Sequence, residues 1–318
     1  MSKHIETISR KIFIAGGRGL VGSAIIGCLK DRGYANILAP SHKELEFMDQ
    51  QAVNLYFEKE KPEIVFLAAA KVGGIVANKT YPADFIYQNL MIQNSLIHQS
   101  YVHGVKKLLF LGSSCIYPRD CDQPIKEKYL MTGPLESSNS PYAIAKIAGI
   151  EMCWAYNRQY NTHFIPVMPT NLYGPNDNFD YETSHVLPAL IRKFHEAKEN
   201  NLDSVAVWGT GTPKREFLHV DDLARACVFL METAGTKLDF KKPLINIGTG
   251  KDLSIAELAL LVKQVVGFNG DIIYDRSKPD GTPQKLLDVS VLTSLGWTSQ
   301  VPLKEGIQTT YKWFLENY

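Results

Sequence analysis

The first half of the chain alternates short apolar runs with longer amphipathic segments. The apolar runs have the length and composition of buried parallel strands and lie at residues 11–15, 37–39, 64–69, 107–111 and 163–168. Helical patterns separate these runs at residues 22–31, 51–60, 84–103 and 141–160. Strands that alternate with helices in this way predict an α/β protein with a doubly wound parallel sheet.

The second half of the chain is less regular. Strand-like residues at 205–208, 217–220 and 244–247 accompany helical patterns at 221–233 and 254–266, after a loop-rich stretch at 174–183. These patterns predict a Rossmann domain with a smaller, interleaved substrate-binding domain. The expected division assigns residues 1–170 and 215–249 to the Rossmann domain, and residues 171–214 and 250–318 to the second domain.

A glycine-rich loop follows the first apolar run and opens the first helix. Gly17, Gly19 and Gly22 match G-x-G-x-x-G, and Gly16, Gly19 and Gly22 match G-x-x-G-x-x-G. Either spacing places a dinucleotide pyrophosphate at a helix N-terminus, where free N–H groups and the helix dipole favour an anion. A tight strand-to-helix turn without a ligand is the alternative. The order of strand, loop and helix favours the dinucleotide.

The end of the second predicted strand bears on the choice of nicotinamide cofactor. NAD-binding sheets place an acidic residue there, on the adenosine 2′-hydroxyl. Residues 39–43 read APSHK, and the first acid is Glu44. Arg18 in the glycine loop supplies a guanidinium suited to a 2′-phosphate. These features favour NADPH over NADH, unless Arg18 only solvates the loop surface.

A tyrosine and a lysine stand four residues apart at the start of a predicted helix. Ser140 and Pro141 suit the N-cap and the first helical position, so Tyr142 and Lys146 would project from one face. A nearby ammonium favours phenolate and is expected to bring the pKa of Tyr142 closer to working pH. With Ser113 at the end of an apolar run, this pair can exchange a proton with a carbonyl or alcohol oxygen.

The composition is that of a globular protein without a strong charge bias. Of the 318 residues, 45% are hydrophobic and 21% are charged, and the net charge is +1. We therefore expect neither a nucleic-acid nor a membrane partner. The five cysteines are scattered without a C-x-x-C pair, so we expect no metal site or disulfide framework and a reducing, cytoplasmic setting.

Several segments are more specific than the glycine loop and Y-x-x-x-K. They are AAAKVGGI at 68–75, GSSCIYP at 112–118, PTNLYGP at 169–175, SHV at 184–186 and KPDGTP at 278–283. In these segments the chain resembles the GDP-fucose synthase family of the extended short-chain dehydrogenase/reductase superfamily, from about residue 10 to the C-terminus. The resemblance implies 3,5-epimerisation and 4-reduction of GDP-4-keto-6-deoxymannose with NADPH, and a homodimer.

The resemblance also implies roles for individual residues. Cys115 matches the family's base and His185 its acid, Ser113 and Tyr142 would hold the C4 oxygen, and Lys146 would hold the nicotinamide ribose. The implied cofactor-binding residues are Gly16, Gly17, Arg18, Gly19, Leu20, Val21, Gly22, Leu45, Tyr142, Lys146, Pro169, Asn171, Leu172 and His185. The implied GDP-sugar-binding residues are Lys193, Trp208, Arg215, Asp280 and Lys285.

The chain departs from the family pattern at two positions. Lys193 stands where an arginine is expected, so the charge is kept without the bidentate fork. Pro40 stands where family members can carry an arginine that binds the 2′-phosphate. Arg18 is therefore expected to contribute a larger share of the preference for NADP over NAD.

Simpler interpretations apply to other candidate residues. The cysteines on apolar helices fit core packing, His219 fits a structural role before a helix, and Trp208 could pack in the core of the second domain. Packing is also the alternative for Cys115. Two other functions share the fold: an NAD-dependent nucleotide-sugar 4-epimerase and a non-catalytic NADP-binding redox sensor.

Overall fold

A six-stranded parallel sheet forms the larger part of the molecule in this computed structural model, which describes residues 9–181, 183–233, 238–278 and 280–318. In spatial order the strands are β2 (Ile37–Leu38), β1 (Ile12–Ala15), β3 (Ile64–Leu67), β4 (Lys107–Leu111), β5 (Phe164–Pro169) and β9 (Ile245–Ile247). The predicted doubly wound sheet is confirmed. The direction of winding reverses between β1 and β3, and such a switch point is where open parallel sheets bind ligands.

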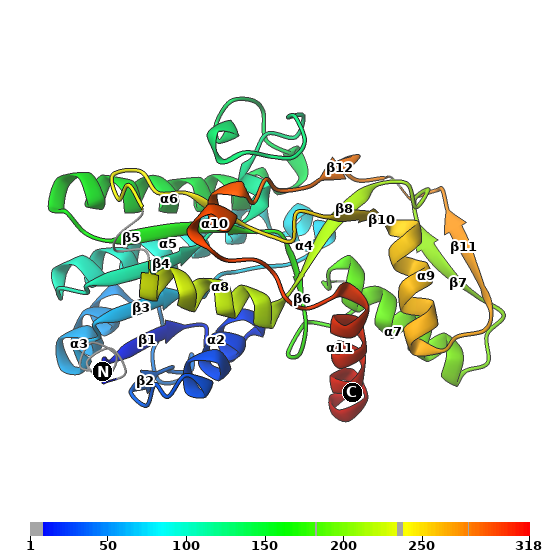
Figure 1. Cartoon of the computed structure of the whole chain (residues 1–318), viewed down its shortest axis with the longest axis horizontal. Coiled ribbons are helices and arrows are strands. Elements are labelled where there is room, and N and C mark those ends of the chain that lie inside the picture. Colours follow the sequence, from blue (N-terminus) through cyan, green and yellow to red (C-terminus); the bar gives the residue numbers. More distant parts are fainter. Residues whose placement is uncertain (1–8, 182, 234–237, 279) are drawn as a thin grey trace.

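Both faces of this sheet are covered by helices because its strands are apolar on both sides. Along β1, Ile12 and Ile14 belong to one core cluster, while Phe13 and Ala15 belong to another. The first cluster packs beneath α2 (Leu20–Asp31) and α8 (Val220–Thr233). The second packs beneath α3 (Gln50–Glu60), α5 (Pro82–Val102) and α6 (Ser140–Tyr160) (Figure 1). Each large apolar side chain buried in this way contributes roughly 1.5–3 kcal/mol.

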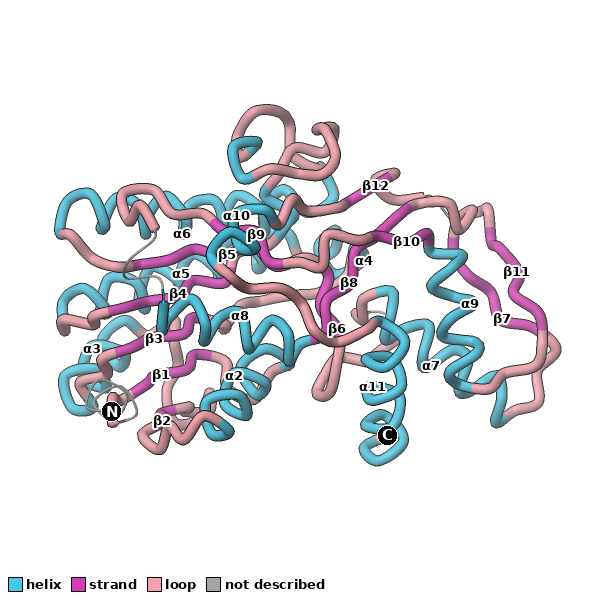
Figure 2. The backbone as a smooth tube through the Cα atoms, in the orientation of Figure 1, coloured by secondary structure: helices cyan, strands magenta, loops and turns pink. Residues whose placement is uncertain are grey.

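A smaller unit lies beside the carboxyl ends of these strands (Figure 2). Its central strand, β8 (Lys214–His219), pairs with β6 (Asn171–Tyr173), β10 (Asp252–Ser254) and β12 (Gln284–Lys285). A separate pair joins β7 (Ser204–Trp208) to β11 (Asp271–Asp275). A third core cluster lies among the helices of this unit, which are α7 (Val186–Glu199), α9 (Ile255–Val266) and α11 (Leu303–Asn317).

Short elements connect these layers. They are α4 (Ile75–Thr80), α10 (Ser290–Leu295) and the 3₁₀ turns η1 (Ser114–Ile116), η2 (Glu127–Tyr129) and η3 (Ser137–Asn139). The helix α6 begins one residue earlier than expected: Asn139 is its N-cap and Ser140 its first residue. The predicted cap at Ser140 is therefore wrong, while Pro141 does lie in the first turn.

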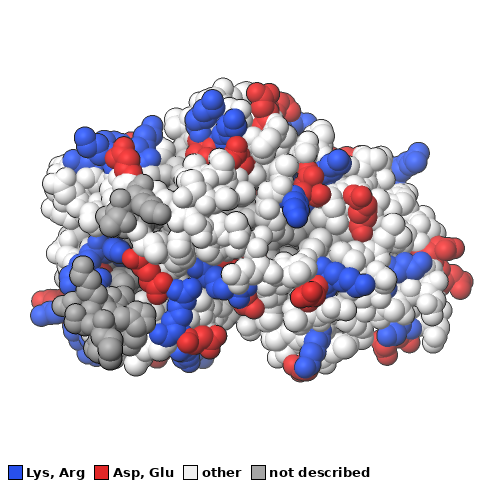
Figure 3. Space-filling view, in the orientation of Figure 1, with Lys and Arg blue, Asp and Glu red and all other residues white. Residues whose placement is uncertain are grey.

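Charged side chains of both signs are interspersed on the face seen in Figure 3, without an extended patch of one sign in that view. Within the described ranges, no helix combines the length and apolar character needed to cross a membrane. Pro279, in the segment KPDGTP, lies outside the described residues.

Candidate active site

The glycine loop joins β1 to α2, and its glycines differ in what a side chain would meet. Gly16 has φ +85°, and a Cβ there would lie 2.9 Å from the Ala69 nitrogen. A Cβ on Gly22 would lie 2.1 Å from the Gly16 oxygen. Gly19 is the N-cap of α2, and its Cβ would meet only the Gly16 oxygen, at 3.6 Å. Gly19 is thus the position open to a ligand, and it belongs to both glycine spacings.

The open backbone at Gly19 fits a dinucleotide pyrophosphate. The first N–H groups of a helix have no partner within the helix, and in α2 these belong to Leu20, Val21 and Gly22. Gly17 serves a different purpose, because a Cβ there would lie 2.7 Å from the Ala39 Cβ. The absence of a side chain at Gly17 therefore allows the loop to pack against the end of β2.

A carboxylate lies close to Arg18, contrary to the expectation that the strand end lacks one. The Glu44 carboxylate accepts hydrogen bonds from the backbone N–H and the hydroxyl of Ser41, both at 2.7 Å. These bonds lower the pKa of Glu44, and the nearby Arg18 guanidinium lowers it further. A turn folds Glu44 back toward the sheet, and the spacing along the chain did not reveal this turn.

Ser113, Tyr142 and Lys146 converge at the carboxyl end of β4, as predicted. The Ser113 hydroxyl caps η1 by accepting the Cys115 N–H at 3.4 Å. The Lys146 Nζ donates to the Leu111 carbonyl oxygen at 2.8 Å and lies 5.8 Å from the centre of the Tyr142 ring. These contacts attach the first turns of α6 to the end of the strand that carries Ser113.

The protonation state of Tyr142 differs from the expectation. Burial raises the pKa of Tyr142 well above its ordinary value, and the nearby Cys115 raises it further, while the Ser113 side chain opposes the shift. Burial also lowers the pKa of Lys146 to about 8. Burial disfavours the charged form of each group, the phenolate of Tyr142 and the ammonium of Lys146. Tyr142 is therefore protonated in this structure and can donate its proton.

The two proposed epimerisation groups occupy different elements. Cys115 lies in η1 with 7% of its surface exposed, and burial raises the pKa of its thiol. His185 is the N-cap of α7 and is accessible, yet surrounding protein atoms lower the pKa of its imidazole. Burial thus disfavours the charged form of each of these two side chains.

The segment before His185 is linked to the start of α6 through α4. The N–H of Gly74, the N-cap of α4, donates to the Thr183 carbonyl oxygen at 3.1 Å. The helix α4 in turn packs against η3, which leads directly into α6 and Tyr142. The fold thus connects the segment before His185, the start of α6 and the loop 68–74 through one set of contacts.

The residues assigned to the nucleotide lie in the smaller unit. Lys285 on β12 is aligned with Arg215 on β8, and the Asp280 carboxylate acts electrostatically on Arg215. Trp208 is 55% exposed on β7, and Lys193 and Lys278 place their amines 5.2 and 5.5 Å from its ring centre. Core packing is therefore not the role of Trp208. An exposed indole with two cations close to its ring suits a nucleobase that carries phosphates.

Other predicted residues have mainly structural contacts. Leu45 is 4% exposed and packs in the core with Phe13, so only its backbone is available to a cofactor. Pro169 ends β5, while Leu172 packs against the core on β6. Asn171 donates to the Glu216 carbonyl oxygen at 2.8 Å.

Glu216 is a residue whose importance the sequence analysis missed. Its carboxylate is fully buried and accepts the backbone N–H groups of Thr249 at 2.6 Å, Gly250 at 2.7 Å and Leu287 at 3.0 Å. It therefore joins β8 to the segments that follow β9 and β12. The only sequence signal is an acid inside the otherwise apolar end of a strand, which does not reveal its partners.

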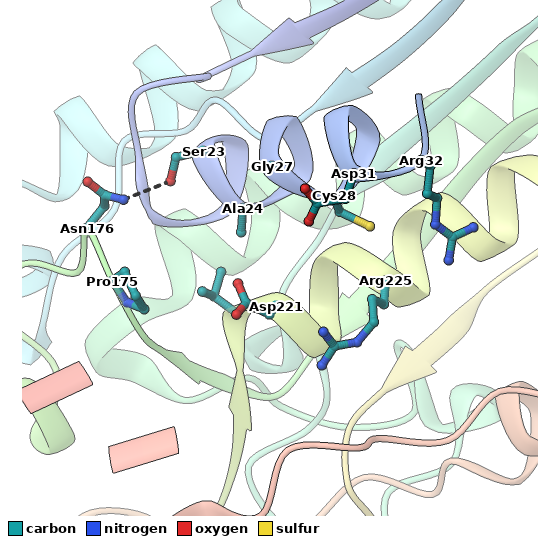
Figure 4. Close-up of a pocket in the computed structure, with 11 residues that line it drawn as sticks. Ser23, Ala24, Gly27, Cys28, Asp31, Arg32, Pro175, Asn176, Asp221 and Arg225 are labelled. Atoms are coloured by element: carbon teal, nitrogen blue, oxygen red, sulfur yellow. Dashed lines mark hydrogen bonds between the residues drawn. The ribbon is translucent and has the colours of Figure 1, made fainter. Parts of the chain in front are cut away.

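A groove of about 400 Å³ lies elsewhere, between α2 and α8 (Figure 4). Asn176 and Ser23 meet at one end through a hydrogen bond of 3.3 Å, and Arg32 and Arg225 also line it. None of the described lining residues belongs to the predicted catalytic, cofactor-binding or substrate-binding sets. The predicted site residues therefore lie elsewhere than this groove.

A glycine loop at a switch point, together with serine, tyrosine and lysine at the end of β4, defines an enzyme of the short-chain dehydrogenase/reductase class. Residues 12–248 match the NAD dependent epimerase/dehydratase family, and the chain belongs to that family.

Similar proteins match over nearly the whole chain. The chain is 60% identical to "Putative GDP-L-fucose synthase 2" of Arabidopsis thaliana, over 97% of this chain and 93% of that protein. It is 55% identical to "GDP-L-fucose synthase" of Escherichia coli strain K12, over 97% of each. A GDP-mannoheptose C4 reductase from Campylobacter jejuni with NADP bound superposes with a TM-score of 0.90, at 45% identity, over 97% of this chain and 99% of that chain.

Proposed function

We infer that the enzyme converts GDP-4-dehydro-6-deoxy-D-mannose to GDP-L-fucose by 3,5-epimerisation and NADPH-dependent 4-reduction. The observation that carries this inference is the convergence of Ser113, Tyr142, Lys146 and Cys115 at the end of β4. Both kinds of step require groups that hold the C4 oxygen, which are Ser113 and Tyr142. Epimerisation also requires a base, and the Cys115 thiol is placed to supply it. The relatives at 60% and 55% identity carry the same activity in their names.

Epimerisation uses the acidity of the carbons beside the C4 carbonyl. Cys115 removes the proton from C3 or C5, and the electron pair of the C–H bond moves onto the C4 oxygen as an enolate. Ser113 and Tyr142 stabilise this oxygen by hydrogen bonding, as an oxyanion site does. His185 then donates a proton to the opposite face of the same carbon, which inverts it.

Reduction uses the protonated state of Tyr142. NADPH supplies the hydride for C4 when it is bound. Tyr142 donates its proton to the C4 oxygen, and its high pKa in the buried site means that this proton is present at working pH. Lys146, fixed to the Leu111 carbonyl oxygen, would hold the nicotinamide ribose.

The division of labour between the two parts of the chain belongs to the same proposal. Residues 1–170 and 215–249 would bind NADP, except that β8 with its Arg215 belongs to the smaller unit. Residues 171–214 and 250–318 would bind the GDP-sugar. Support comes from the open Gly19 backbone on α2 and from the exposed Trp208 between Lys193 and Lys278.

We also propose that the enzyme is a homodimer that pairs α5 and α6 with those of a second copy. Large apolar side chains are exposed on these two helices, with Tyr87 61%, Ile144 48% and Tyr160 41% exposed. Light scattering at micromolar concentration should give twice the mass of the chain, and a monomer would refute this proposal.

A reducing, cytoplasmic setting also belongs to the proposal, and the scattered cysteines support it.

The decisive experiment is incubation with the 4-ketosugar nucleotide and NADPH in deuterium oxide, with the product identified by NMR. We expect stoichiometric NADPH oxidation and GDP-L-fucose with deuterium at C3 and C5. Cys115→Ser should abolish deuterium entry, because a hydroxyl is a far weaker base than a thiolate. His185→Gln should impair inversion while NADPH binding is kept.

Other results would indicate the alternative functions. Product formation without net NADPH oxidation would indicate a 4-epimerase that recycles its cofactor. NADPH binding without turnover would indicate a sensor. Reduction without deuterium at C3 and C5 would indicate a C4 reductase.

A further inference from the structure

An asparagine side chain is buried in the middle of the apolar strand β9. Asn246 is 0% exposed and lies between Ile245 and Ile247. Burial of an amide costs free energy unless its polar atoms have partners. The Asn246 Nδ2 donates to the carbonyl oxygens of Ile125 at 2.9 Å and Asp288 at 3.1 Å. Because a carbonyl oxygen can only accept, these two bonds fix which end of the amide carries the oxygen.

The remaining polar atom of this amide accepts a hydrogen bond from Tyr117. The Tyr117 hydroxyl donates to Asn246 Oδ1 at 2.6 Å. Tyr117 is 3% exposed, and burial raises the pKa of its phenol, so the hydroxyl keeps the proton that it donates. Tyr117 follows Cys115 by two residues and is the C-cap of η1. The bond therefore attaches the end of the turn that carries Cys115 to the central residue of a sheet strand.

The hydrogen bonds within η1 are long by comparison. The Ile116 N–H lies 3.3 Å from the Ser113 carbonyl oxygen, and the Cys115 N–H lies 3.4 Å from the Ser113 hydroxyl. Hydrogen bonds weaken as donor and acceptor move apart. The 2.6 Å bond from Tyr117 to Asn246 is shorter than both. The turn is thus held weakly from within and firmly from outside, at the residue that ends it.

The same asparagine joins the loop after η1 to the segment after β12. The Ile125 N–H donates to the Leu286 carbonyl oxygen at 2.7 Å, and the Asp288 N–H donates to the Ile125 carbonyl oxygen at 2.8 Å. The Glu127 carboxylate accepts the N–H of Asn246 at 3.0 Å. Asn246 is therefore the residue at which the first sheet, the Cys115 segment and a segment of the smaller unit are fixed relative to one another.

We propose that the hydrogen bond between Tyr117 and Asn246 positions the Cys115 thiol for proton abstraction at C3 and C5, which makes both of them positioning residues for epimerisation. This role rests on the proposed function, because it requires Cys115 to be the base. A displacement of about 1 Å can slow a reaction ~10²-fold. Ser113 precedes the turn and Tyr142 lies on α6, so the groups that hold the C4 oxygen do not depend on this bond.

The test measures proton exchange and hydride transfer separately in Tyr117→Phe, which removes only the hydroxyl. Exchange is the entry of deuterium at C3 and C5 of the 4-ketosugar nucleotide in deuterium oxide with NADP⁺ present, so that no hydride is available. The exchange rate at saturating sugar should fall about tenfold or more, while the KM for the sugar should change by less than about twofold.

Hydride transfer is measured in the reverse direction, with GDP-L-fucose and NADP⁺. In that direction the hydride leaves C4 for NADP⁺ and the proton leaves the C4 hydroxyl before any inversion takes place. The initial rate of NADPH formation in Tyr117→Phe should therefore stay within about twofold of the parent rate.

Two further variants separate this role from folding. Tyr34→Phe is the matched control, because Tyr34 is 6% exposed and its hydroxyl donates to the Glu232 carboxylate at 3.0 Å, just before β2. Its exchange rate should equal that of the parent protein even where its stability is lower. Asn246→Ala removes the acceptor from the other side and gives the same readout if Tyr117→Phe does not fold. In the Asn246→Ala background, Tyr117→Phe should cause no further loss of exchange.

A second measurement needs no sugar. Cys115 is 7% exposed, so a turn that is less firmly held should open to reagents more often. The rate of its alkylation by iodoacetamide, followed by peptide mass spectrometry at one fixed pH, should rise roughly three- to tenfold in Tyr117→Phe. The rate in Tyr34→Phe should be that of the parent protein.

Parent-like exchange in folded Tyr117→Phe or Asn246→Ala would overturn the proposal. Equal losses of exchange and of reverse hydride transfer would also overturn it, because they would indicate a general structural role, as would an equal loss in Tyr34→Phe. If the parent protein shows no exchange at all, the proposed function is refuted instead. The alkylation rates then still decide whether the bond fixes Cys115, and an unchanged rate in Tyr117→Phe would show that it does not.

Discussion

The Lys146 amine lies 2.8 Å from the Leu111 carbonyl oxygen, at the last residue of β4. This bond connects α6 to the strand that leads to Ser113 and Cys115. Burial dominates the pKa of both side chains, raising that of Tyr142 and lowering that of Lys146. Tyr142 is consequently poised as a proton donor.

Replacing Tyr142 by phenylalanine should separate reduction from epimerisation. Tyr142→Phe removes the proton donor to the C4 oxygen, so single-turnover hydride transfer should fall by ~10²–10⁴. Deuterium entry at C3 and C5 should fall less, because Ser113 still holds the enolate oxygen. The double variant Ser113→Ala/Tyr142→Phe should lose both. Equal losses of both reactions in Tyr142→Phe would contradict the separate roles.

Arg18 and Glu44 should together set the cofactor preference. Arg18→Ala should raise the KM for NADPH roughly ten- to hundred-fold and that for NADH little, because a charge-assisted contact to the 2′-phosphate is worth about 1.5–3 kcal/mol. Glu44→Gln should lower the KM for NADPH, since the phosphate then no longer shares Arg18 with a carboxylate. Equal effects of Arg18→Ala on both cofactors would remove the basis of this assignment.

The Glu216 carboxylate should be a large contributor to stability. Glu216→Ala leaves three backbone N–H groups without their acceptor, and we expect the free energy of unfolding to fall by about 3–5 kcal/mol. Glu257→Ala is a suitable control, because it removes an exposed capping-box acid and should cost much less stability. Urea denaturation measures both, and similar small losses would show that the Glu216 bonds are dispensable.

Asp177 should make stability depend on pH. Its Oδ2 is buried without a partner among the described residues, and burial raises the pKa of Asp177 to about 7, whereas the unfolded value is about 3.9. Between these values the folded chain binds more protons than the unfolded chain, so the free energy of unfolding falls as pH rises from about 4 to 7.

Substitution of Asp177 by asparagine should flatten that dependence. At pH 8, Asp177→Asn should be more stable than the parent protein, with about 4 kcal/mol as the upper limit, and the difference should shrink near pH 4. Urea denaturation at pH 5 and pH 8 tests this. Asp122→Asn, at an exposed position, should change neither value. A parent-like pH slope in Asp177→Asn would show that another group titrates.

The alternation of apolar runs and helical segments was sufficient to predict the sheet, because buried parallel strands and their covering helices have distinct local periods. The glycine loop and the spacing of Tyr142 and Lys146 are also local: a turn requires particular residues, and positions i and i+4 share a helix face. The roles proposed for Cys115 and His185 came instead from resemblance, since a lone cysteine or histidine has no local signature.

Tertiary structure alone decided the relationships that act across the chain. The strand β9 completes the first sheet, Glu216 joins three segments, and Lys285 is aligned with Arg215 because β12 pairs with β8. Contacts between residues so far apart leave no pattern in nearby sequence. The protonation of Tyr142 likewise follows from burial, which depends on the whole packed site rather than on a neighbouring lysine.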